Sequence, residues 1–163
     1  MSAPSSIVIR QALIADLDLV VPLFDAYRQF YRQPSDLYLA RRFIADRLAH
    51  RDSIIFLALD AQQAAAGFTQ LYPSFSSVSA ARIYILNDLF VAPHVRRQGV
   101  GAQLLTAAAE FARSAGAVRL SLSTENTNVD AQKLYRTEGW RQSTEYFYDL
   151  ELPRVASTRS AHG

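Results

Sequence analysis

Arginines, glycines and a predicted helix start lie together between Asp88 and Leu105. This segment reads DLFVAPHVRRQGVGAQLL, a strand-like apolar run followed by a proline turn, two arginines and two glycines. The first turn of a helix carries unpaired N–H groups and a partial positive charge, so it binds anionic phosphate. Glycine lets such a backbone come close to the anion. The segment therefore predicts a phosphate-binding turn, although a glycine-rich strand-to-helix turn without a ligand has the same pattern.

Other motifs for phosphate, nucleophile or metal chemistry fit this chain less well. No Gly-Lys-Ser/Thr follows the glycines, and Leu104 stands where a dinucleotide fingerprint needs its third glycine. The sequence has no Gly-x-Ser-x-Gly elbow, and because it has no cysteine it offers no thiolate nucleophile, thiolate metal site or disulfide. His50 and His94 have no partner at metal-ligand spacing, so we predict no metal site.

The elements that must hold the turn follow from the apolar periodicity. Strands are predicted over 6–10, 53–59, 66–72, 82–91, 117–123 and 146–152, and helices over 15–33, 35–51, 99–116 and 128–138. We expect Asp16 to cap the first helix, Ser35 or Asp36 the second, and Gly139 to end the last. Because the first strands form a meander and later ones alternate with helices, the pattern predicts a mixed, largely antiparallel α/β sheet with helices on both faces.

Length and composition limit the function classes. A chain of 163 residues predicts a single domain over 1–152 with a flexible tail over 153–163. A net charge of +2, with arginines spread along the chain, is weak evidence for nucleic acid. No apolar run approaches the roughly 18 residues of a membrane span, and Met1 to Ser6 lacks the features of a signal peptide. We expect a cytoplasmic protein without nucleic-acid or membrane partners.

A second segment, NVDAQKLYRTEGW from Asn128 to Trp140, makes the first more specific. Together they resemble the GNAT superfamily of acyl-CoA-dependent N-acetyltransferases. The likeness rests on Arg96, Gly99 and Gly101 after the strand LNDLFV, and on the order and spacing of Asn128, Ala131, Leu134, Tyr135 and Gly139-Trp140. YRQFYRQ and LNDLFV look most similar to the histone and polyamine acetyltransferase-like branch. The resemblance implies a sheet that is splayed between its fourth and fifth strands.

The resemblance also implies that acetyl-CoA binds in this split as the co-substrate. In the family the pantetheine arm lies between these strands, and the N–H groups of the following turn hold the pyrophosphate. The cofactor-binding residues implied are Leu89, Phe90, Val91, Arg96, Arg97, Gln98, Gly99, Val100, Gly101, Ala102 and Asn128. Core packing is an equally good explanation for Leu89 and Val91.

Acetyl transfer to an amine needs a deprotonated nucleophile, stabilisation of the developing oxyanion and a proton for the departing thiolate. With no cysteine to carry the acetyl group, direct attack in a ternary complex is favoured. Tyr135 matches the tyrosine with which the family often protonates the sulfur, although packing explains a tyrosine on such a helix too. A backbone N–H of Leu89 or Val91 is the expected oxyanion donor.

The general base is less clearly marked. Many relatives carry an acid at the position of Asn87, but an amide takes up no proton at neutral pH. Asp88 is the remaining carboxylate on this strand. Strict alternation would point it away from Asn87 and Leu89, whereas a bulge would change that parity. We predict that Asp88 matters, with Glu125 or a water chain ordered by Asn87 as alternatives.

Aromatic and acidic residues near the first two helices suggest an acceptor site. Ammonium groups are attracted to ring faces and carboxylates. The candidates are Tyr27, Tyr31, Asp36, Tyr38, the loop near Tyr72, and Asn87. Ordinary amphipathic helices would also explain about half of them.

The sequence leaves the acceptor's identity open. A non-catalytic acyl-CoA sensor on the same fold is the alternative function. Relatives are often dimers, and the alternating strand Tyr146 to Leu152 could pair with a second subunit to form a homodimer.

Overall fold

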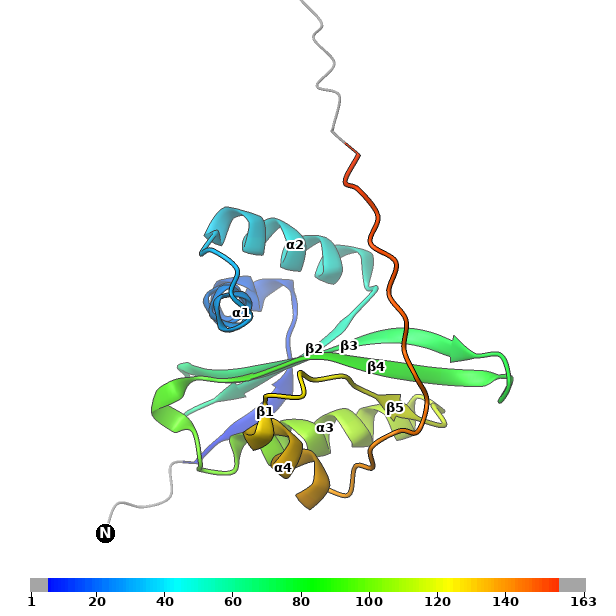
Figure 1. The fold of residues 1–163 in the computed structure, drawn as a ribbon. Helices are drawn as coiled ribbons and strands as arrows, with labels where there is room; N and C mark the ends of the chain where they lie inside the picture. The colour runs from blue at the N-terminus through cyan, green and yellow to red at the C-terminus, as the bar shows by residue number, and fades with distance from the viewer. Residues whose placement is uncertain (1–5, 156–163) are drawn as a thin grey trace, which may run out of the picture.

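A five-stranded sheet with helices on both faces forms the body of the chain (Figure 1). The computed structural model describes residues 6–155, so the N-terminal residues 1–5 and most of the predicted tail, 156–163, lie outside it. The strands are β1 (Val8–Gln11), β2 (Ile54–Leu59), β3 (Ala65–Ser76), β4 (Ala81–Val91) and β5 (Leu120–Ser121), in that spatial order. The pairs β1–β2, β2–β3 and β3–β4 are antiparallel and β4–β5 is parallel, which confirms the predicted mixed sheet.

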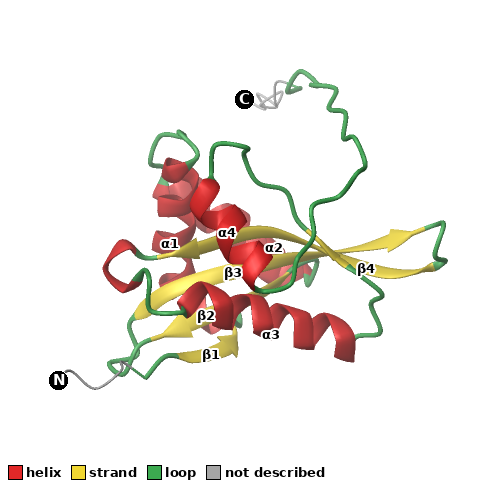
Figure 2. Cartoon of the chain, turned by 60° about the horizontal axis from the view of Figure 1, so that its bottom comes forward, coloured by secondary structure: helices red, strands yellow, loops and turns green. Residues whose placement is uncertain are grey.

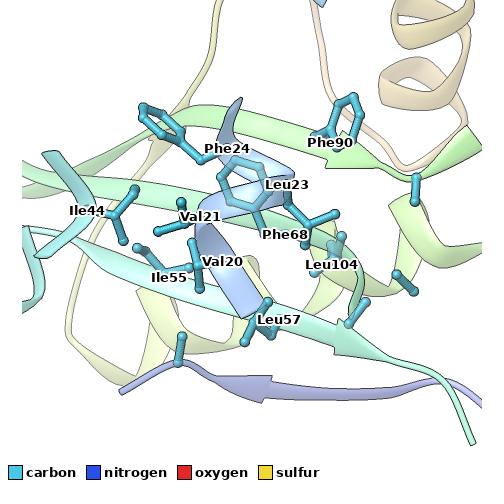
Figure 3. Close-up of a cluster of buried hydrophobic side chains, with 14 of the residues drawn as sticks. Val20, Val21, Leu23, Phe24, Ile44, Ile55, Leu57, Phe68, Phe90 and Leu104 are labelled. Carbon is cyan, nitrogen blue, oxygen red and sulfur yellow. The ribbon is translucent and has the colours of Figure 1, made fainter. Parts of the chain in front are cut away.

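Two helices cover each face of the sheet. The helices α1 (Leu17–Phe30) and α2 (Leu37–His50) lie on one face, and α3 (Val100–Ser114) and α4 (Val129–Thr137) on the other (Figure 1). Under α1 and α2, Val20, Ile44 and Phe68 are fully buried in one apolar cluster (Figure 3). A second cluster under α3 contains Leu71, Leu86, Leu105 and Ala108. No helix within residues 6–155 is long and apolar enough to cross a membrane.

Helix ends follow local chemistry with one correction. Asp36 caps α2 as predicted, because its Oδ1 accepts a hydrogen bond of 2.9 Å from the backbone N–H of Leu39. Gly139 follows α4 with a φ of +85°, as expected for a C-terminal glycine. Asp16 stands at the N-cap position of α1 as predicted, but its side chain does not cap the helix. Its carboxylate instead accepts hydrogen bonds from the Arg10 guanidinium, at 2.8 and 2.7 Å.

Strand lengths differ from the prediction at two places. The β3–β4 hairpin includes part of the predicted serine-rich loop, since β3 continues to Ser76, and it projects beyond the rest of the sheet (Figure 2). In contrast, β5 retains only Leu120 and Ser121 of the predicted strand over 117–123. The pairing of β4 with β5 is limited to Tyr84 with Leu120 and Ile85 with Ser121. Beyond Ile85 the two strands separate, which confirms the splayed sheet.

The predicted strand over 146–152 is not formed in the single chain. Residues 140–155 have no regular secondary structure, and residues 146–155 are all exposed. Figure 1 shows the segment in orange and red, rising past β4 and leaving the body of the molecule. The alternation of the sequence is intact, but a strand needs a neighbour for its backbone hydrogen bonds.

Candidate active site

A bulge in β4 decides which way Asp88 faces. Leu71 pairs with Leu86, but the preceding residue Gln70 pairs with Asp88, so Asn87 is the extra residue. Side chains before the bulge, such as Leu86, belong to the cluster under α3. After the bulge the parity changes, and Phe90 pairs with Phe68, whose ring packs against Phe24 and Tyr27 of α1. Asp88 therefore shares the α1 face of the sheet with Gln70.

Asp88 is a buried carboxylate held by neutral donors. Its residue is only 1% exposed, and its Oδ1 accepts a 2.7 Å hydrogen bond from Nδ2 of Asn87. Nε2 of Gln70 donates to Oδ2. No salt bridge reaches Asp88 within residues 6–155. Burial raises the pKa of Asp88, and the hydrogen bonds from Asn87 and Gln70 oppose that shift. A carboxyl tuned upward in this way suits a general base near neutral pH.

Tyrosines lie beside Asp88 and the adjoining backbone. The Tyr27 hydroxyl donates to the backbone carbonyl of Asn87 at 3.1 Å, and its ring meets that of Tyr31 with centroids 5.1 Å apart. Burial and the charge of Asp88 raise the pKa values of Tyr27 and Tyr72. Tyr27 and Tyr72 therefore lie near Asp88, and Tyr31 packs against Tyr27.

Tyr135 is held on α4 by packing. Its ring lies beside that of Trp140, with centroids 6.1 Å apart, and both pack against the cluster under α3. The Trp140 N–H donates to the Tyr135 carbonyl at 2.9 Å, which closes the turn after the helix. Burial, with a smaller effect of Tyr31, raises the pKa of Tyr135 to about 12. The phenol is therefore a protonated donor throughout the neutral range.

The two glycines at the start of α3 have different structural reasons. Gly99 has a φ of +78° and a Cβ there would meet nothing within 4 Å, so the backbone shape requires the glycine and the space before it is open. Gly99 is the N-cap residue of α3, and it has no side chain to cap the first turn. At Gly101 a Cβ would come within 2.9 Å of Leu134 Cδ2, so this glycine lets α4 approach α3. The backbone shape thus accounts for Gly99 and the packing of α4 for Gly101, and the close approach to an anion that we expected of both glycines stays a prediction.

The predicted arginines flank this helix start. Arg96 donates from Nε to the Val91 carbonyl at 2.9 Å and lies over the Phe90 ring, 5.6 Å from its centroid, so it fastens the turn to β4. Arg97 is exposed and has a φ of +62°. Since the Val100 side chain is buried, only its backbone can serve a ligand.

An ion pair that the sequence did not predict joins the end of α1 to the segment that follows β5. NH2 of Arg32, just after α1, lies 2.6 Å from Oε1 of Glu125, which follows β5. A cavity of about 280 Å³ lies there; its lining is Phe30, Arg32, Glu125, Thr127, Asn128, Val129 and Asp130. The hydrogen bond from Arg32 lowers the pKa of Glu125. Glu125 is thus a weaker candidate for the base than Asp88.

Comparison with known proteins identifies the fold and the chemistry. A model of the Acetyltransferase (GNAT) family matches residues 20–140. The chain belongs to the GNAT acetyltransferase family. It is 49% identical to the uncharacterized N-acetyltransferase YhfO of Bacillus subtilis over 146 residues, which cover 89% of this chain and 97% of the relative. A crystal structure of a probable acetyltransferase is 44% identical, with a TM-score of 0.82 over 91% of this chain and 98% of the other.

More distant GNAT relatives differ in substrate. The aminoalkylphosphonate N-acetyltransferase of Salmonella typhimurium is 40% identical over 77 residues, about half of either chain. The ribosomal-protein-alanine N-acetyltransferase of Brucella melitensis is 19% identical with a TM-score of 0.79, over 90% of this chain and 100% of the other, which shows the fold alone. The protein is thus an acetyltransferase, and acetyl transfer to an amine is the general reaction of its family. The finer likeness to the histone and polyamine branch stays a prediction.

In this GNAT acetyltransferase, only some of the predicted acceptor residues lie near Asp88. Tyr27 and Asn87 lie beside Asp88, and Tyr31 packs against Tyr27. Asp36 instead caps α2, and its N–H donates to Asp25 at 2.8 Å. Tyr38 is 73% exposed beside Arg42. Neither belongs to the group around Asp88.

Two further residues, Asn128 and Gln70, cap a helix and support Asp88, respectively. Asn128 caps α4, its Oδ1 accepting from the Ala131 N–H at 3.4 Å, and its contact with a cofactor stays a prediction. Gln70 was missed, although two adjacent polar residues, Thr69 and Gln70, in the apolar run AGFTQLY were a readable signal. Both are completely buried and hydrogen-bond to Asp88.

Proposed function

We propose that this acetyltransferase moves the acetyl group of acetyl-CoA to a primary amine of a small molecule or protein, by direct attack in a ternary complex. The observation that carries the proposal is Asp88, a buried carboxylate with neutral partners at the split of the sheet. Such a group costs folding free energy and is retained where it has chemical work. The proposal includes a homodimer, because the exposed apolar residues 146–152 need a partner.

The residues at the split fit acetyl-CoA. The space before Gly99 at the start of α3 is open, and this N-cap residue has no side chain, which suits a diphosphate. Residues 86–91 of β4 have no strand partner on the β5 side within the described chain, which suits the amides of an extended pantetheine arm. Leu89 and Val91 are half-buried, whereas Phe90 is buried, so Phe90 would contribute its backbone. Acetyl-CoA, when bound, supplies the activated acyl group.

Asp88 is the proton acceptor in this proposal. An amine is mostly protonated at neutral pH and must lose a proton before it attacks. A carboxyl whose pKa is raised accepts that proton more readily than an ordinary aspartate. Asn87 and Gln70 hold its two oxygens, so they orient it. Tyr27 and Tyr31 supply ring faces for the ammonium group before deprotonation.

Tyr135 and the β4 backbone complete the chemistry. The Tyr135 hydroxyl donates its hydrogen to the departing sulfur. An N–H of Leu89 or Val91 donates to the carbonyl oxygen as negative charge develops. The Arg32–Glu125 pair places a positive and a negative charge beside Phe30 in the cavity of about 280 Å³. It therefore favours acceptors that carry an acidic group as well as the amine.

The test is the release of free thiol from acetyl-CoA across a panel of amines, amino acids, aminoalkylphosphonates, polyamines and peptides. The proposal predicts amine-dependent release with at least one class, and its loss in Asp88→Asn. Tight acetyl-CoA binding without release for any acceptor would instead indicate an acyl-CoA sensor.

A further inference from the structure

Asp88 is enclosed too tightly to meet an acceptor amine directly. Its residue is 1% exposed, and the side-chain amides of Asn87 and Gln70 hold one carboxylate oxygen each. An amine bound in the split of the sheet is kept from both oxygens by these neighbours. A general base must be within hydrogen-bond reach of the proton that it takes, directly or through one intermediate group. Proton transfer to Asp88 therefore needs a group that reaches both the carboxylate and the substrate.

The Tyr27 hydroxyl lies between Asp88 and the outside of the molecule. It donates a hydrogen bond of 3.1 Å to the backbone carbonyl of Asn87, the residue next to Asp88. A hydrogen bond with Tyr27 also lowers the pKa of Asp88, so the hydroxyl is within reach of the carboxylate as well as of the carbonyl. A hydroxyl rotates to suit its partners, and it both donates and accepts. It can therefore take one proton while it gives up another.

Burial decreases from Asp88 outward to Tyr27. The hydrogen bond from Gln70 to Asp88 is buried, and the one from Asn87 to Asp88 is partly buried. The hydrogen bond from Tyr27 to Asn87 is exposed, and the Tyr27 residue is half-buried. Of these three side chains, Tyr27 is therefore the one that an incoming amine meets first.

Aromatic packing fixes the position of this hydroxyl. The centroid of the Tyr27 ring lies 6.3 Å from that of Phe24, which is stacked on it. Phe68 and Tyr31 meet the ring edge-on, with centroids at 5.9 and 5.1 Å. Because these contacts hold the ring, the hydrogen of the hydroxyl is the part that remains free to turn. Proton transfer requires donors and acceptors that are held in place in this way.

We propose that Tyr27 is a further catalytic residue, which relays a proton from the acceptor ammonium group to Asp88. One N–H bond of the ammonium group breaks as its hydrogen bonds to the Tyr27 oxygen, and the hydroxyl's own hydrogen moves to the Asp88 carboxylate. The amine is left neutral, with an electron pair free to attack the acetyl carbonyl, while Tyr27 is again a phenol and Asp88 holds the proton.

The two transfers of the relay occur together. Burial and the charge of Asp88 raise the pKa of Tyr27, which opposes a separate phenolate. The titratable side chains that act on Tyr27 are Tyr31, Tyr72 and Asp88, and of these Asp88 is the carboxylate that can keep the proton. The relay rests on the proposed function, because it serves acetyl transfer to an amine.

The contact between the hydroxyl and the carboxylate can be measured without turnover. Carbon-13 labelling of the aspartate carboxyls gives a resonance for Asp88, which is identified by its loss in Asp88→Asn. Tyr27→Phe removes a hydrogen bond that lowers the pKa of Asp88, so the titration midpoint of this resonance should move to higher pH. Tyr72→Phe is the matched control and should leave the midpoint in place, since within residues 6–155 no hydrogen bond joins Tyr72 to Asp88. An unmoved midpoint in Tyr27→Phe would overturn the relay.

Turnover distinguishes the hydroxyl of Tyr27 from its ring. Tyr27→Phe keeps the ring face for the ammonium group, so a role of the ring alone predicts the kcat of the wild type. The relay instead predicts a loss of about 10²–10⁴-fold in kcat, with the affinity for acetyl-CoA unchanged. The double variant Tyr27→Phe/Asp88→Asn should lose no more than Asp88→Asn alone, because both residues act on the same proton.

The outcomes separate the relay from the proposed function. Amine-dependent thiol release that is lost in Asp88→Asn but kept in Tyr27→Phe would overturn the relay alone. Losses that multiply in the double variant would also overturn it, because they would show two independent roles. No release by the wild type with any amine would overturn the proposed function, and the relay with it.

Discussion

Asn87 bulges out of β4 and donates its side-chain amide to the carboxylate of the next residue, Asp88, at 2.7 Å. The bulge turns Asp88 onto the face covered by α1, where it is buried beside Gln70. An amide at position 87 therefore orients the carboxylate at position 88.

Asp88→Asn should lower kcat by about 10²–10⁴-fold, the usual contribution of a general base. The wild-type pH–rate profile should have an acid limb set by Asp88, and the variant should lack it. Asp88→Glu, which keeps the carboxyl group, should retain part of the activity. A limb that persists unchanged in Asp88→Asn would assign the proton transfer to another group.

The same variant should be more stable than the wild type at pH 7. Burial raises the pKa of Asp88, so the folded state binds its proton more tightly than the unfolded state. That contribution to stability is complete below the unfolded pKa, near 4, and is lost as pH rises through the folded value. Thermal unfolding should show the higher Tm of Asp88→Asn at pH 7 and a smaller difference near pH 4. A lower Tm at pH 7 would show that the ionised carboxyl stabilises the fold.

Gln70→Leu tests the positioning of Asp88. The hydrogen bond from Gln70 lowers the pKa of Asp88, so its loss should move the acid limb to higher pH. Thr69→Val is the matched control, because the Thr69 hydroxyl donates to the backbone carbonyl of Asp88 at 2.8 Å and not to its carboxylate. The control should lose about 1 kcal/mol of stability with the limb unmoved. If the acid limb falls at the same pH in both variants and in the wild type, Gln70 has no part in the mechanism.

Tyr135→Phe should lower turnover about 10–100-fold while acetyl-CoA still binds. The hydroxyl is the only atom lost, and the ring keeps its packing against Trp140. Tyr84→Phe, in the buried core beside Phe111, is the control and should leave turnover unchanged. Unchanged turnover of Tyr135→Phe, with acetyl transfer shown to be rate-limiting, contradicts the acid role.

Gly99→Ala and Gly116→Ala form a matched pair at the two ends of α3. Both glycines have positive φ, +78° and +75°, and a Cβ would meet nothing within 4 Å at either. Each substitution should therefore cost about 1–2 kcal/mol of stability. Only Gly99→Ala should also weaken acetyl-CoA binding, because only that end presents first-turn N–H groups to the diphosphate. Equal affinities in calorimetric titrations of the two variants would place the diphosphate elsewhere.

The sequence predicted the order of strands and helices because each element has its own apolar period and end signals, such as Asp36 and Gly139. Bulge position and strand pairing depend on contacts between distant segments. For this reason the direction of Asp88 stayed open until Gln70 and Leu71 were placed opposite β4. Asp16 stands at the predicted N-cap position, but its carboxylate binds the Arg10 guanidinium, a contact that the local pattern of the helix start does not show. The strand over 146–152 is locally encoded but lacks a partner in the single chain.

The most direct test of the central claim is a calorimetric titration of the purified chain with acetyl-CoA. Recognition at the Gly99 turn and the open edge of β4 predicts saturable binding with one site per chain, and competition by free CoA. Absence of binding by both acetyl-CoA and free CoA would contradict the account.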